Sequence, residues 1–154
     1  MLTHVDSCFA PLSGGLESSD IVRDYDLKCS FPNAFLLRHP WAEHVRKWID
    51  GSLMQMLPGL DRSAAKKLIN SAFGIGDRCV QEWCTAHGLS QLPPALASYL
   101  AEIRKGALAD MRDHPDIVKQ VEEVAGYTGA KLRNAVAYIL NSMGERQAWQ
   151  TCRT

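Results

Sequence analysis

The sequence predicts an all-α protein, a compact bundle of five or six helices with an irregular N-terminal segment. Apolar residues recur at spacings of three and four over most of residues 36–154, which is the period of an amphipathic helix. Proline and glycine residues divide these periodic stretches into short segments. The chain has 154 residues, 46% of them hydrophobic, which is enough for one domain with a buried core. We therefore expect one helical domain over residues 36–154.

Residues 1–35 show no regular apolar period, because Pro11 and the glycine and serine residues after it interrupt every pattern. Apolar side chains still occur along the whole segment, so we expect it to pack across the helical body, with a short helix near Ser19–Asp26. It holds five acidic and two basic residues, whereas the remainder holds twelve acidic and fifteen basic residues. An alternative role for this segment is an arm that binds a protein partner or a second copy of the chain.

The first predicted helix begins at Pro40, because proline is favoured in the first helical turn, and ends at Pro58-Gly59. Its inward face is predicted to comprise Trp41, Val45, Trp48, Ile49, Leu53 and Met56. Residues 63–87 then predict two short helices joined at Gly74, with Ser63 as the cap of the first and Asp77 as the cap of the second. The inward positions of this pair are Leu68, Ile69, Ala72, Phe73, Val80, Trp83 and Cys84. Two helices joined by a short glycine turn form a helix-turn-helix arrangement.

The order of these residues resembles the helix-turn-helix of the phage-repressor, Cro-like family. The resemblance covers residues 63–103 and depends on Gly74, Ile75, Val80, Trp83, Gly88 and the pair Pro93-Pro94. Asn70 departs from the pattern, because the family has a small residue in the middle of the first helix. The resemblance implies that the second helix enters the major groove of double-stranded DNA.

Four residues of this first candidate are predicted to contact DNA: Lys66, Lys67, Arg78 and Gln81. The arginine and the glutamine are suited to base edges, and the lysines of the preceding helix are suited to phosphates. Asp77 and Glu82 also face outward on the second helix, and carboxylates are unfavourable near a phosphate backbone. They favour the alternative in which this helix pair is a scaffold and the partner is a protein.

A second candidate lies in residues 116–143. A helix from 94 to about 111 is predicted to bury Leu96, Leu100, Ile103 and Ala107, and a helix after His114-Pro115 carries Ile117, Val118, Val121, Val124 and Ala125. Gly126 ends that helix, and Thr128 is the predicted cap of the next, whose inward residues are Leu132, Val136, Ile139, Leu140 and Met143. After Gly144 we expect a polar tail in which Trp149 docks on the body.

This second stretch resembles the shorter-linker helix-turn-helix of winged and simple bacterial regulators. Lys131, Arg133 and Asn134 come near the start of its second helix, and these side-chain types bind phosphates and read guanine or adenine edges. The alternative is an ordinary helical hairpin whose basic face is solvated.

Other functions find less support in the sequence. Cys79, Cys84 and His87 have a spacing unlike that of zinc sites, so we expect buried thiols and no metal or cofactor. The sequence shows no nucleophile elbow and no phosphate-binding glycine loop, so we do not expect an enzyme. The odd number of scattered cysteines and the lack of a signal peptide or a membrane-spanning run predict a cytoplasmic protein.

Together these patterns predict a DNA-binding transcriptional regulator of bacterial or phage type. Such a protein acts by occupying a promoter or operator, as a homodimer on a two-fold site. The alternative is a helical protein–protein interaction module, such as an adaptor, an inhibitor or a secreted effector, which does not bind DNA.

Overall fold

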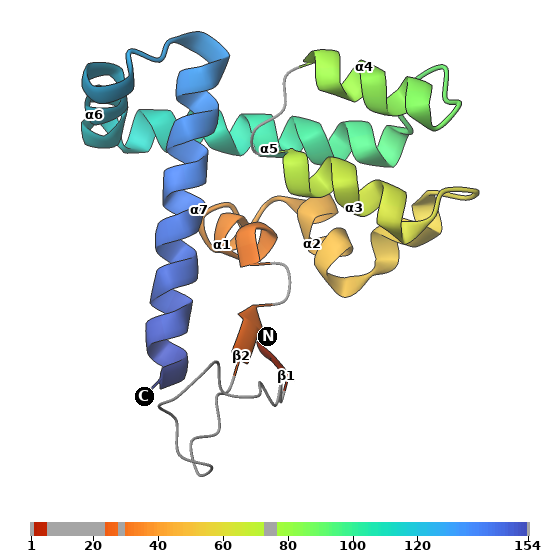
Figure 1. The fold of residues 1–154 in the computed structure, drawn as a ribbon, viewed down its shortest axis with the longest axis horizontal. Coiled ribbons are helices and arrows are strands. Elements are labelled where there is room, and N and C mark those ends of the chain that lie inside the picture. Colours follow the sequence, from red (N-terminus) through yellow and green to blue (C-terminus); the bar gives the residue numbers. More distant parts are fainter. Residues whose placement is uncertain (1, 6–23, 28–29, 73–76, 154) are drawn as a thin grey trace, which may run out of the picture. The chain divides into compact units, whose positions relative to one another are not determined.

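The computed structural model describes residues 2–5, 24–27, 30–72 and 77–153, although not the side chains of the two strands or of residues 77, 78, 148, 149, 152 and 153. The chain divides into two units, Met1–Ser30 and Phe31–Thr154, and each is described by itself. Within the described residues the protein is all-α apart from one short strand pair, with seven α-helices and one 3-10 helix. The predicted class is therefore confirmed, and one helix more than the upper prediction is present (Figure 1).

The N-terminal unit contains two antiparallel strands, β1 (Leu2–Val5) and β2 (Asp24–Leu27). They pair in a register that places Leu2 opposite Leu27 and Val5 opposite Asp24. The prediction of a wholly irregular segment is thus wrong for these residues, and the helix predicted near Ser19–Asp26 is replaced by a strand over its last three residues. The rest of that stretch lies outside the described residues, and the packing of the segment on the helical body stays a prediction.

Helix α1 (Ser30–Arg38) begins inside the segment that was predicted to be irregular. It buries Phe35 completely against α5 (Pro94–Asp113), where Gly106 leaves no room for a larger side chain beneath the ring. On α7 (Gly129–Arg153), a Cβ at Gly144 would lie 2.9 Å from the Cβ of Ala34. Two glycines therefore allow α1 to approach both α5 and α7 closely.

The helix predicted from Pro40 is shorter than expected and is interrupted. Helix α2 spans Glu43–Asp50, and a 3-10 helix, η1 (Ser52–Met56), follows Gly51, whose φ of 88° ends the α-helix. Trp41 and Met56 are exposed rather than inward, whereas Val45, Trp48 and Leu53 are buried as predicted. The N-terminus of α2 is capped from α5, because the Glu102 carboxylate accepts the backbone N–H groups of His44 at 2.9 Å and of Val45 at 3.1 Å.

Helices α3 (Arg62–Ser71) and α4 (Asp77–Ala86) occupy the first predicted helix-turn-helix. Asp61, and not Ser63, caps α3, since its carboxylate accepts the N–H of Ala64 at 2.7 Å. Leu68, Ile69, Ala72 and Cys84 are buried as predicted, and Val80 and Trp83 are half-buried. Phe73, Gly74 and Ile75 lie outside the described residues.

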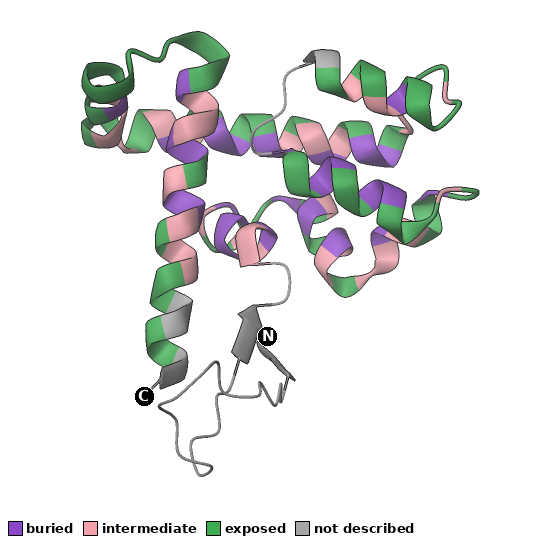
Figure 2. Cartoon of the chain, in the orientation of Figure 1, coloured by how far each residue is buried: buried purple, intermediate pink, exposed green. Residues whose placement is uncertain are grey.

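The last three helices are α5, α6 (Pro115–Ala125) and α7. The predicted face of α5 is largely confirmed, because Leu96, Ile103 and Ala107 are buried and Leu100 is half-buried. The polar residues after Gly144 continue α7 to Arg153, and the predicted docking of Trp149 lies outside the described side chains. Exposed residues predominate on α6 and at the start of α7 (Figure 2).

Candidate nucleic-acid interface

Helices α6 and α7 meet at a tight corner. Gly126 has φ 65° and ψ 22°, the left-handed conformation that favours glycine at a helix C-terminus, and its N–H donates to the carbonyl of Glu122 at 3.0 Å. Only Gly126, Tyr127 and Thr128 separate the two helices, and α7 begins at Gly129. Figure 1 shows α6 almost end on and α7 lengthwise, so the two helices cross instead of running antiparallel. This is the geometry expected of a helix-turn-helix.

One apolar cluster holds this corner together. Its buried members are Val121, Leu132, Val136 and Leu140, and Met111, Ile117, Val118, Ala135 and Ile139 pack against it. The cluster draws on α5, α6 and α7, which form a three-helix unit around it. Three residues of the predicted apolar faces are exposed, because Val124 and Ala125 lie at the end of α6 and Met143 lies beyond the cluster on α7.

The predicted DNA-contacting residues of this corner lie on the first two turns of α7. Lys131 is exposed, and its Nζ lies 5.9 Å from the centroid of the Tyr127 ring. Arg133 and Asn134 are half-buried, and the Nε–H of Arg133 donates to Oδ1 of Asn134 at 3.4 Å. Among the residues whose side chains are described, no carboxylate forms an ion pair with Lys131 or Arg133.

The other candidate corner has a different surface. Lys66 and Lys67 are exposed on α3 and Gln81 is exposed on α4, whereas the side chain of Arg78 lies outside the described part of the chain. Glu82 and Thr85 are exposed beside Gln81, and together with Ala86 they line a shallow hollow of about 480 Å³. The indole Nε1–H of Trp83 donates to the carbonyl of Ala64 at 3.1 Å, which ties α4 back to α3.

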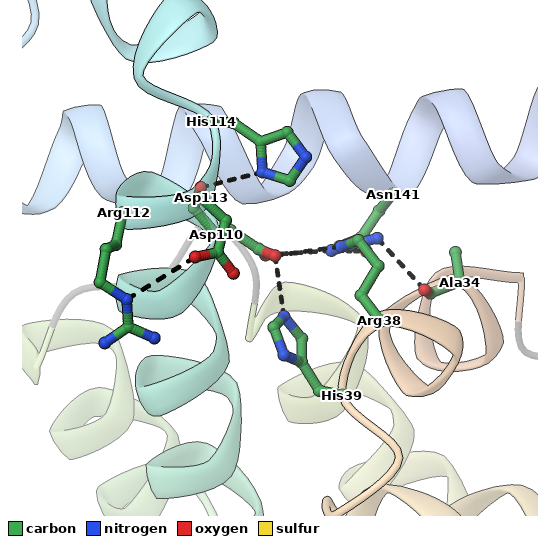
Figure 3. Close-up of polar contacts among 8 residues, drawn as sticks. All are labelled: Ala34, Arg38, His39, Asp110, Arg112, Asp113, His114 and Asn141. Atoms are coloured by element: carbon green, nitrogen blue, oxygen red, sulfur yellow. Dashed lines mark hydrogen bonds and ion pairs between the residues drawn. The ribbon is translucent and has the colours of Figure 1, made fainter.

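A buried polar cluster, which the sequence analysis missed, joins α1, α5 and α7 (Figure 3). Asp110 is 1% exposed, and it accepts Nε–H and Nη2–H of Arg38 at 3.1 Å each. Nε2 of His39 lies 2.8 Å from the same carboxylate, and Nη2 of Arg38 also donates to Oδ1 of Asn141 at 2.8 Å. We call these four residues the Arg38 clamp. The only indication of this cluster in the sequence is Asp110, a carboxylate on the otherwise apolar face of α5 that carries Ile103 and Ala107.

The Arg38 clamp is a structural feature of the interior. His39 and Asn141 are 4% and 0% exposed, so an external substrate does not reach them without a rearrangement. The clamp fixes the middle of α7, two turns after its basic residues, against α1 and α5. It thereby holds in place the helix that carries Lys131 and Arg133.

The cysteines and histidine considered for zinc are not arranged as a site. Cys79 is exposed and Cys84 is buried, and the ring of His87 lies 4.7 Å from that of Trp83. In the part of the chain that is described, no three potential metal ligands gather. No helix among the described residues has the length and apolar character needed to cross a bilayer.

Comparisons of the chain with protein-family models, with curated proteins and with solved structures find no match.

Proposed function

We propose that the chain binds double-stranded DNA by placing the first two turns of α7 in the major groove. The observation that carries this proposal is the corner at Gly126, where a three-residue turn that begins with this glycine in the left-handed conformation joins two crossing helices. A recognition helix presented in this way is the arrangement by which helix-turn-helix proteins reach base edges.

Electrostatics support the same placement. The N-terminus of α7 carries a partial positive charge, and Lys131 and Arg133 add two cations without an ion-paired carboxylate among the described side chains. Glu122 and Glu123 belong to α6, and Glu123 lies 3.9 Å from Lys119 of the same helix. The first two turns of α7 contain no acidic residue, whereas α4 contains Glu82.

In this proposal the protein regulates transcription by occupying an operator or promoter. Two copies on a two-fold site would place their α7 helices about 34 Å apart, one turn of the duplex. No cofactor is needed, because phosphate contacts supply the affinity and base contacts supply the specificity.

A salt titration with a nonspecific 20-base-pair duplex tests the proposal. We expect binding at low salt, with an affinity that falls steeply as salt rises. The double variant Lys131→Ala/Arg133→Ala should weaken binding and reduce the slope of log K against log salt by about 1 for each of the two cations that contacts a phosphate. Lys66→Ala/Lys67→Ala makes the same change of charge at the other corner and should leave the slope unaltered.

Two results contradict the proposal. Absence of duplex binding at low salt removes the DNA-binding function altogether. A reduced slope in the α3 variant, with an unchanged slope in the α7 variant, moves the interface to α3 and α4.

One observation favours a second candidate, a helical protein-interaction module. Val124 is 83% exposed and Tyr127 is 42% exposed at this same corner, and exposed apolar side chains together with tyrosine are typical of protein interfaces. Val124→Ser removes the apolar surface without changing the charge. DNA affinity is expected to be unchanged in this variant, whereas loss of a protein complex would support the module.

A further inference from the structure

The contact between Arg133 and Asn134 assigns them different roles. We propose that Arg133 reads a guanine and that Asn134 is a positioning residue which orients the guanidinium without reading a base. This inference rests on the proposed DNA-binding function and specifies the base that Arg133 on α7 recognises.

The start of α7 leaves room for a side chain to reach the groove floor. Gly129 and Ala130 are exposed and have no side chain beyond Cβ, so the first turn of the helix is narrow. Arg133 comes four residues, or about one turn, after Gly129 and lies on the same face of α7. Its long side chain can therefore extend over the narrow first turn. The helix can therefore approach the base edges closely at this point.

The hydrogen bond between the two side chains, at 3.4 Å, leaves each of them different groups for a base. It engages Nε of Arg133, and among the described residues neither Nη group has a partner, so the pair of donors that meets O6 and N7 of guanine is unoccupied. Asparagine reads adenine with its carbonyl oxygen and its amide nitrogen together, but Oδ1 of Asn134 is turned toward Arg133. The arrangement thus favours guanine over adenine.

Lys131 has a different task. It lies roughly 200° around the helix from Arg133, so it cannot contact the same base edge. Its ammonium group is an exposed point charge near the Tyr127 ring, which suits a phosphate rather than bidentate recognition. The two cations therefore divide into a phosphate contact and a base contact.

The test is selection by the full chain from a pool of duplexes randomised over about 20 base pairs, enough for both half-sites of a two-fold site, followed by affinity measurements on single-base variants of the selected site. We expect one position in each half-site at which guanine is preferred about 10-fold or more over the other bases. Arg133→Ala should abolish the preference at that position alone. Arg133→Lys should reduce it, because lysine keeps the charge and can donate to O6 and N7 but lacks the planar pair of donors. Asn134→Ala should weaken the guanine preference without creating another.

Arg146→Ala is the matched control, since Arg146 is an exposed cation on the later part of the same helix. It should leave the preference intact, and circular dichroism establishes that each variant is folded. An adenine preference that disappears in Asn134→Ala and persists in Arg133→Ala overturns the inference. If Arg133→Ala lowers the affinity for all duplexes equally, the inference is also overturned, because that result indicates a phosphate contact. Failure of the unaltered chain to bind any duplex at low salt overturns the proposed function itself.

Discussion

The α3–α4 and α6–α7 corners follow the same sequence pattern, helix, glycine, helix, but they differ in the exposed side chains that the structure describes on the second helix. At α6–α7 the cluster of Val121 and Leu132 fills the angle between the helices, and α7 begins with Gly129 and Ala130. On α4 the exposed face described beside Gln81 includes Glu82. A glycine turn therefore identifies a helical corner, and the chemistry of the following two turns decides which partner it suits.

The largest effect is expected from breaking the Arg38 clamp, which braces α7. Asp110→Ala leaves Arg38 and His39 without their carboxylate in the interior, and we expect the free energy of unfolding to fall by about 4 kcal/mol. Hydrogen exchange should increase more in α1 and α7 than in α3, because the clamp joins only α1, α5 and α7. Chemical denaturation and amide exchange measure both quantities.

Asp113→Ala is the control for this variant, since Asp113 lies one turn later on α5 with its side chain 61% exposed. Its effect should be within about 0.5 kcal/mol, as for most surface substitutions. An equal increase of exchange in α3 would show that both corners depend on the clamp, and the contrast between them would then be lost.

The clamp also shows where the sequence was insufficient. Asp110 is 72 residues from Arg38, and Asn141 is 103 residues from it, so no local pattern links them. Helix α1 was missed for a related reason, because its nine residues gain their stability from tertiary contacts at Gly106 and Gly144 rather than from a long apolar period. The elements α5 and α6 were predictable from their periodicity and their end signals, since Pro94 begins α5, Pro115 begins α6 and Gly126 ends α6.

The candidate site was predictable in part. Gly126 and the inward residues Val121, Leu132 and Val136 followed from spacing, and the structure confirms their placement. The contact of Arg133 with Asn134 did not follow, because it depends on side-chain rotamers that a sequence pattern does not specify.

A smaller effect is expected from cavities made at each corner. Leu132→Ala and Leu68→Ala each remove a buried leucine, and we expect each to lower the free energy of unfolding by about 3 kcal/mol. Measured at a low temperature where both variants are folded, only Leu132→Ala should weaken DNA binding, because it loosens the angle between α6 and α7. Weaker binding in Leu68→Ala alone would indicate that α3 and α4 carry the interface.

The smallest effect concerns the start of α3. Asp61→Ala removes the side chain that accepts the N–H of Ala64, and loss of such a cap costs about 1 kcal/mol. Ser63→Ala, at the position predicted from sequence, should change the stability by much less, because Ser63 lies inside the first turn and is exposed. Urea denaturation of the two variants distinguishes the caps, and a larger loss in Ser63→Ala would contradict the assignment. DNA affinity should be the same in both variants, since α3 anchors the fold of its own corner and the proposed reader belongs to the other.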